Sequence, residues 1–222
     1  ISRTNWILTN IDKSPKISDA KKTQYKGEAH FLRGLYYFNL VRLFGDVPWI
    51  DKQQTASDDL QVSRTSKDIV YQHIIDDFSD AASMLPAVYE NTTDIGRATK
   101  GAAFGLLAKV YLTLKRYNET LVAIDSVMNL GVYSLNRKYE WNFSDLRENG
   151  PESLFEVQYE KDVTAYSEFD ILGQGGWHHE YMAPLASINI GGPWGNFGWF
   201  AVYPEFVESY EPGDLRKSVS VW

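Results

Sequence analysis

Aromatic side chains gather in a glycine-rich stretch late in the sequence. The rings between positions 166 and 200 are Tyr166, Phe169, Trp177, Tyr181, Trp194, Phe197, Trp199 and Phe200. A flat ring can cover the C–H face of a pyranose while neighbouring amides satisfy its hydroxyls, and loops are where binding residues concentrate. We therefore predict that the ligand contacts are Trp177, Tyr181, Trp194, Trp199 and Asn196. The alternative is that these rings only pin a glycine-rich excursion to the rest of the fold.

The charges around these rings favour an uncharged ligand. From Asp162 through Leu215 there is no Lys or Arg, whereas eight Asp or Glu residues occur. Phosphate, nucleotide or sulfated ligands would lack a cationic partner there. A neutral ligand, such as a neutral glycan, fits this stretch better.

Residues that could support catalysis lack the spacing that catalysis needs. The tandem His178, His179 and Glu180 point in diverging directions in any regular structure, and no HExxH motif occurs. Glu168 and Asp170 could form a glycosidase pair, but nothing in the sequence places them on opposite sides of a sugar. Phosphate-binding loops, GxSxG elbows and dinucleotide fingerprints are also missing. The sequence therefore predicts a binding protein that is not an enzyme, with no metal and no cofactor.

Composition narrows the possible partners. With 22 basic and 29 acidic residues the formal charge is -7, which disfavours nucleic acid. No stretch approaches the ~20 apolar residues of a membrane span. There is no cysteine, hence no lipobox, so any lipid anchor is absent from this chain. The sequence starts at Ile1 and ends within the strand-like "SVSVW", and we interpret it as a fragment of a longer protein.

The elements that must carry these residues are mostly helices. Apolar periodicity predicts them over residues 2–12, from Ser18 to Gly45, and from a cap at Thr65 or Ser66 to Leu85. The second of these carries two apolar rows, which predicts neighbours on more than one face. The rows are Phe31, Leu35 and Phe38, and Leu32, Tyr36 and Leu40. The acidic residues of the third helix, Asp76, Asp77 and Asp80, are expected to face water.

Residues 98–131 form the clearest unit, a pair of helices that resembles a tetratricopeptide repeat. Phe104, Leu107, Ala108 and Tyr111 match the first helix of that repeat well, whereas the second helix matches loosely. Gly101, Gly105 and Ala108 should form a flat strip that another backbone can approach. Leu121, Ile124 and Val127 should face back toward the first helix. A generic helical hairpin remains the alternative.

After Gly131 the pattern changes to loops and short strands. The segment "ESLFEVQY" alternates as a strand does. We expect a mainly α protein with tetratricopeptide-like hairpins and an aromatic-rich, loop-rich region packed against them. It would form a single domain over residues 1–222, with a helical part at 1–131 and a ligand-facing part at 132–222.

Four segments in this order resemble the SusD/RagB family. They are "EAHFLRGLYYFNLVRLFGDVPWI", "RATKGAAFGLLAKVYLTLKRYNETLVAIDSVMNLGVYSL", "ESLFEVQY" and "YPEFVESYEPGDLRKS". The resemblance implies a SusD-like helical superhelix in an outer-membrane lipoprotein of Bacteroidetes. Such a protein would capture glycans at the cell surface and work with a SusC-like TonB-dependent transporter. It also implies that about half of the family's usual length is present, and that Asp214 and Arg216 are a structural pair. A RagB-like oligopeptide binder or a purely protein-docking module is the alternative.

Overall fold

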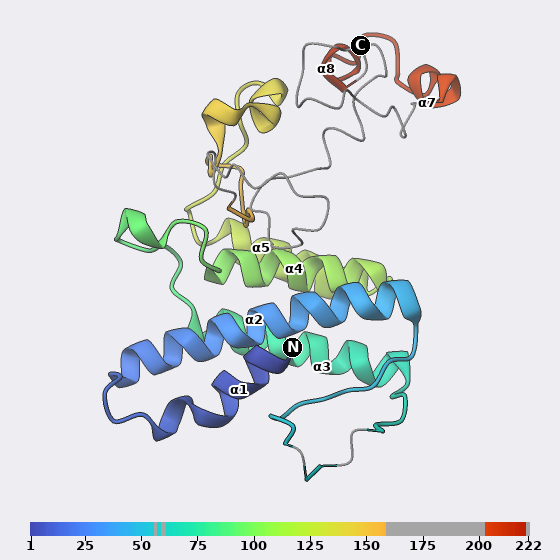
Figure 1. Cartoon of the computed structure of the whole chain (residues 1–222). Helices are drawn as coiled ribbons and strands as arrows, with labels where there is room; N and C mark the ends of the chain where they lie inside the picture. Colours follow the sequence, from blue (N-terminus) through green and yellow to red (C-terminus); the bar gives the residue numbers. More distant parts are fainter. Residues whose placement is uncertain (56, 59–60, 159–202, 221–222) are drawn as a thin grey trace, which may run out of the picture. The chain divides into compact units, whose positions relative to one another are not determined.

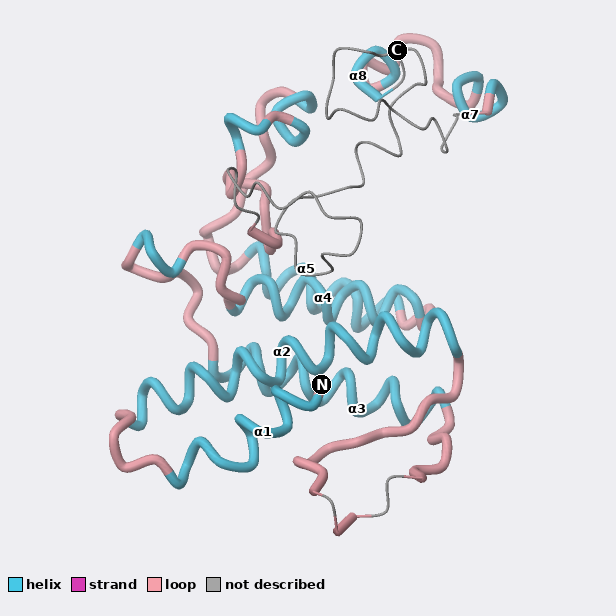
Figure 2. Tube along the Cα trace, viewed as in Figure 1, coloured by secondary structure: helices cyan, strands magenta, loops and turns pink. Residues whose placement is uncertain are grey.

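The computed structural model describes residues 1–55, 57–58, 61–158 and 203–220. They fall into two compact units. The first comprises Ile1–Leu135 with Glu148–Glu156, and the second comprises Asn136–Arg147 with Val157–Trp222. The described part consists of helices joined by loops, which confirms the mainly α prediction (Figure 2). The tetratricopeptide character of the hairpins and the single-domain boundaries stay predictions.

The first two predicted helices are confirmed. Helix α1 spans Ser2–Asn10 and continues into the short η1 at Ile11–Lys13, and α2 spans Asp19–Phe44. The Ser18 hydroxyl accepts from the backbone N–H of Lys21, and Gly45 ends α2 with φ +68°. That dihedral angle is left-handed and suits glycine.

Helix α3 spans Lys67–Met84, and its N-terminus is capped from a distance. Ser66 occupies the N-cap position as predicted, but its hydroxyl makes no capping bond. Instead the Asp46 carboxylate accepts from the backbone N–H of Lys67 at 2.7 Å. A single antiparallel bridge between Val47 and Thr65 closes the connecting loop beside it. The cap therefore ties the end of α2 to the start of α3.

The core forms around α2, which packs against α1, α3 and α4 (Figure 1). This confirms the prediction of neighbours on more than one face. Phe31, Tyr37 and Phe38 are fully buried, whereas Tyr36 is 51% exposed, so the second predicted row is covered only in part. None of the helices in the described part of the chain is long and apolar enough to span a bilayer.

Helices α4 (Lys100–Thr113) and α5 (Tyr117–Met128) form the predicted hairpin, with Thr99 capping α4 through the N–H of Ala102. The predicted inner face of α5 was wrong at two positions, because Leu121 and Ile124 are 61% and 43% exposed. The residues of α5 that are buried are Thr120, Ala123 and Val127. Val127 is buried as predicted, whereas Thr120 and Ala123 each precede a predicted position by one residue, or ~100° around the helix, so the buried face is displaced by part of that angle.

Gly101 and Gly105 of α4 make room for side chains from other segments, and not for a neighbouring backbone. A Cβ at Gly101 would overlap the Tyr133 ring, and one at Gly105 would lie 2.6 Å from Leu154. Both partners belong to loops that follow the hairpin. The prediction of a close backbone approach is therefore replaced by a close approach of two loop side chains.

Strand predictions in the later part of the chain were wrong wherever the structure describes it. Residues 152–158 of "ESLFEVQY" are loop: Leu154 lies against Gly105 of α4, Phe155 packs on Phe31 in the core, and no strand within the described residues pairs with them. Ser218, Val219 and Ser220 of "SVSVW" belong to helix α8, Lys217–Ser220, and the last two residues lie outside the described part of the chain. The remaining short elements are η2 at Thr92–Asp94, η3 at Tyr139–Phe143, η4 at Asp145–Arg147 and α7 at Pro204–Glu208.

We expect Leu107→Ala to lower the free energy of unfolding by about 2 to 3 kcal/mol. Leu107 is 7% exposed and belongs to the core cluster, so truncation loses buried apolar contacts. Leu112→Ala is the matched control on the same helix. Because Leu112 is 55% exposed, this change should lower the free energy of unfolding by no more than about 0.5 kcal/mol. Urea unfolding followed by circular dichroism measures both, and equal losses would mean that the faces of α4 are assigned wrongly.

Candidate functional site

The residues predicted to contact ligand, Trp177, Tyr181, Trp194, Asn196 and Trp199, lie outside the described residues. So do Glu168, Asp170 and the tandem histidines. Their assignment stays a prediction. Within the first unit, the described residues include two other sites with polar side chains: a buried charge cluster and a pocket.

The first is a buried charge cluster, and it corrects the expectation for Asp77. Asp77 is 2% exposed, whereas we expected it to face water. Its carboxylate accepts two hydrogen bonds from Arg33, at 2.7 and 2.9 Å, and lies 2.7 Å from His30 Nδ1. Arg33 also donates to the Asn5 side chain and to the Asp51 carbonyl.

This cluster holds the helices together through buried side chains that are paired with one another. It joins α1, α2, α3 and the loop after α2, and every charged group in it has a partner. No group of three potential metal-ligating side chains occurs among the residues that the structure describes. The ring of His73 stacks on the Trp49 ring, with the two centroids 4.5 Å apart.

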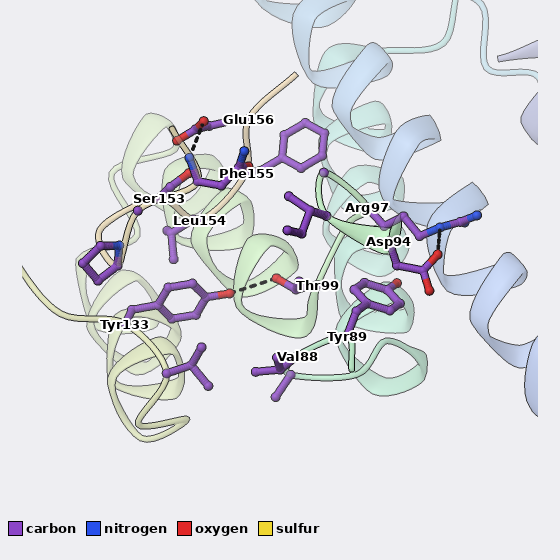
Figure 3. Close-up of a pocket in the computed structure, with 17 residues that line it drawn as sticks. Val88, Tyr89, Asp94, Arg97, Thr99, Tyr133, Ser153, Leu154, Phe155 and Glu156 are labelled. Carbon is purple, nitrogen blue, oxygen red and sulfur yellow. Dashed lines mark hydrogen bonds and ion pairs between the residues drawn. The ribbon is translucent and has the colours of Figure 1, made fainter. Parts of the chain in front are cut away.

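The second place is a pocket of about 290 Å³ that we call the Tyr133 pocket (Figure 3). Three segments build it: the loop from Ala87 to Thr99, the pair Val132 and Tyr133, and the loop from Asn149 to Glu156. They are far apart in sequence and meet at the N-terminal end of α4. The pocket therefore depends on the fold of the first unit and not on one local motif.

Tyr133 forms one wall because α4 leaves space for it. The ring lies over Gly101, where any side chain would collide with it, and its hydroxyl lies 2.9 Å from the Thr99 hydroxyl (Figure 3). Thr99 is also the N-cap of α4, so the ring is tied to the first turn of that helix. Tyr133 is half-buried, which leaves part of the ring facing the pocket.

A charged group lies on the opposite side, where one arginine is paired with two carboxylates. The Arg97 guanidinium donates to Asp94 at 2.7 Å and to both oxygens of Glu28 at 2.8 and 3.0 Å. The Tyr89 hydroxyl donates to the Ala98 carbonyl at 2.9 Å. Burial, together with the neighbouring Glu28 carboxylate, raises the pKa of Tyr89 above its ordinary range.

This arrangement suits an uncharged polar ligand. One arginine facing two carboxylates leaves no spare positive charge for an anion. Apolar side chains of Val88, Ile95 and Leu154 adjoin the two phenols and can cover C–H groups. The sequence patterns did not single out this pocket, although Gly101 was a signal, because a glycine inside a helix marks a close approach.

The comparisons with known proteins all indicate the same family. Residues 1–112 match a family model for SusD-like proteins described as "Starch-binding associating with outer membrane". A SusD-like protein of Bacteroides ovatus is 32% identical over 72% of this chain and 31% of its own length.

Solved structures agree with that match. A SusD superfamily protein of Parabacteroides distasonis has a TM-score of 0.82 and 30% identity over 97% of this chain and 45% of its own. A laminarin-binding SusD-like protein has a TM-score of 0.66 and 29% identity over 72% of this chain and 35% of its own. The chain spans less than half of the length of these relatives.

Proposed function

This chain belongs to the SusD-like family, and we propose that it captures neutral oligo- or polysaccharide at the outer surface of the outer membrane. It would pass the glycan, chemically unchanged, to a SusC-like TonB-dependent transporter. The observation that carries the proposal is the family match, whose description names starch binding and the outer membrane. The laminarin-binding relative supports a glycan ligand as well.

The Tyr133 pocket supports a neutral glycan in particular. Its volume of about 290 Å³ is at the lower end of ligand pockets, which run from about 300 Å³ upward. Its rings can lie against a sugar, and its charges are paired internally. We propose that Trp177, Tyr181, Trp194, Trp199 and Asn196 supply further contacts to the same class of ligand.

Peptide or protein docking is the second candidate function, and one surface favours it. The outer side of α5 exposes apolar side chains, with Leu121, Val122 and Met128 each more than 60% exposed. A groove of about 270 Å³ lies between α4 and α5, lined by Phe104, Leu107 and Tyr111 among others. An apolar helix face could lie in such a groove. Binding of a neutral sugar with no binding of oligopeptides would decide for glycan capture.

Removing the Tyr133 ring should weaken binding of a neutral oligosaccharide by roughly 1 to 3 kcal/mol, the magnitude known for bases stacked on aromatic rings. That corresponds to about five- to 150-fold in dissociation constant. Tyr133→Ala is therefore compared with Tyr133→Phe, which keeps the ring and removes only the hydroxyl. Isothermal titration should show the loss in the first variant and near wild-type affinity in the second. Equal affinities in all three proteins would remove this pocket from the site.

The tryptophan prediction is tested separately. Trp177→Ala or Trp194→Ala should weaken binding about five- to 150-fold by the same stacking argument. Affinity should stay nearly flat between low and moderate salt, because no charge pair is screened. Titration of both variants at two salt concentrations measures this. Unchanged affinity in both would exclude these tryptophans, and a steep salt dependence would indicate a charged ligand.

A further inference from the structure

The second unit contains a hollow of its own, of about 380 Å³, which we call the Tyr210 hollow. Its lining comes from two separated stretches of the chain, η3 and the segment that follows α7. The residues that line it are Tyr139, Phe206, Ser209, Tyr210, Glu211, Asp214 and Arg216. Its charged pair, Asp214 and Arg216, is expected from the family resemblance to be structural, an expectation that leaves the hollow without a role.

A tight turn sets the position of the carboxylate. Gly213 has φ +88°, and the backbone N–H of Asp214 donates to the Glu211 carbonyl at 3.0 Å. Pro212 precedes this glycine, so "EPGD" has the residues and the bond of a type II turn. The positive φ of this turn therefore requires a glycine at position 213, and the turn positions Asp214 at the hollow.

Asp214 then holds Arg216 in a fixed orientation. Its carboxylate accepts from Nε at 2.9 Å and from Nη2 at 2.5 Å, and it also accepts from the Arg216 backbone N–H at 2.9 Å. These hydrogen bonds hold the pKa of Asp214 below its usual range, so the pair stays ionised near neutral pH. The Asp214 side chain is 13% exposed and that of Arg216 is 63% exposed. The guanidinium is thus anchored on one edge and open on the other.

Aromatic rings line the hollow beside this pair. Phe206 in α7 and Tyr210, two residues beyond the end of that helix, pack edge to face with ring centroids 5.6 Å apart. Tyr139 is 41% exposed and packs edge to face on Phe143 at 5.2 Å. Within the described residues no hydrogen bond reaches the hydroxyls of Tyr139 and Tyr210 or Nη1 of Arg216. Three polar groups of the lining can therefore bind a ligand without first giving up a partner.

We infer that the Tyr210 hollow is a second sugar-binding site, which takes a neutral sugar ring against its phenols and holds the hydroxyls with Arg216 and Asp214. The oriented guanidinium donates to sugar oxygens, and the carboxylate accepts from sugar hydroxyls. An anionic ligand is disfavoured, because Glu211 and Asp214 outnumber Arg216 among the lining residues. The choice of sugar as the ligand class rests on the proposed function, whereas the location rests on the geometry of the hollow alone.

The test uses the whole chain labelled with 3-fluorotyrosine, with the signals of Tyr139 and Tyr210 assigned by Tyr→Phe variants. Titration with a neutral oligosaccharide should shift both signals in a saturable manner and leave Tyr203 unmoved. Tyr203 is the matched control, because it lies in the same segment, is 78% exposed and does not line the hollow.

Two variants separate binding from folding. Tyr139→Ala removes one ring, and Ser209→Leu fills the hollow without removing a ring. Tyr139→Ala should raise the dissociation constant measured at the Tyr210 signal about five- to 150-fold. Ser209→Leu should raise it as well, because the larger side chain occupies the space of the ligand, and Tyr203→Ala should leave it unchanged.

The outcomes distinguish the two proposals. If sugar binds but the Tyr139 and Tyr210 signals do not respond, the second site is overturned and glycan capture stands. If no neutral sugar binds to the wild type, both are overturned. If a sulfated sugar shifts these signals and a neutral one does not, the neutral ligand class assigned to the hollow is wrong.

Discussion

Asp77→Ala is expected to lower the free energy of unfolding by about 3 to 5 kcal/mol, because it leaves the buried Arg33 guanidinium without its counterion. The Arg33 side chain is 9% exposed and that of Asp77 is 3% exposed, so water cannot replace the lost carboxylate. Urea unfolding followed by circular dichroism measures the change. A lower midpoint with an unchanged slope would identify a loss of stability.

The adjacent residue supplies the control for this prediction. Asp76 is exposed and accepts one hydrogen bond from Gln72, so Asp76→Ala should cost within about 0.5 kcal/mol. The double variant Asp77→Ala with Arg33→Met removes both charges and should recover part of the loss. A double variant as unstable as the sum of the two single variants would contradict the buried-charge explanation.

Phe31→Ala is the other large effect, with an expected loss of about 3 to 5 kcal/mol. Phe31 is fully buried and packs edge to face on Phe78 at 5.9 Å and on Phe155 at 4.9 Å. Its truncation therefore opens a cavity where α2, α3 and the loop before residue 156 meet.

Phe44→Ala is the matched change on the same helix. Phe44 is 65% exposed at the end of α2, so its truncation should lower the free energy of unfolding by no more than about 0.5 kcal/mol. Denaturant titration of the two variants measures their free energies of unfolding. Comparable losses at both positions would show that the core is not centred on the inner face of α2.

Helix positions could be predicted from the sequence because their signals are local. Ser18, Gly45 and Thr99 mark helix ends through bonds or dihedral angles formed within a few residues. The periodic apolar rows likewise report the faces of one helix. The orientation of α5 was missed because it depends on how the turn after α4 sets the rotation of the next helix.

Features that depend on distant partners could not be predicted in this way. Asp77 looks like one more acid on a solvated face, and its partner Arg33 lies 44 positions earlier. The Tyr133 pocket unites three segments that no motif links. The aromatic residues after position 160 suggest a ligand site by composition alone, which identifies a class of ligand but not the contacts that bind it.

Glycan capture is tested most directly by isothermal titration of the wild-type chain against neutral oligosaccharides, sulfated oligosaccharides and oligopeptides at one ionic strength. We predict saturable binding of at least one neutral oligosaccharide and no binding of the sulfated or peptide ligands. Saturable binding of an oligopeptide together with no heat from any neutral sugar would contradict the proposed function.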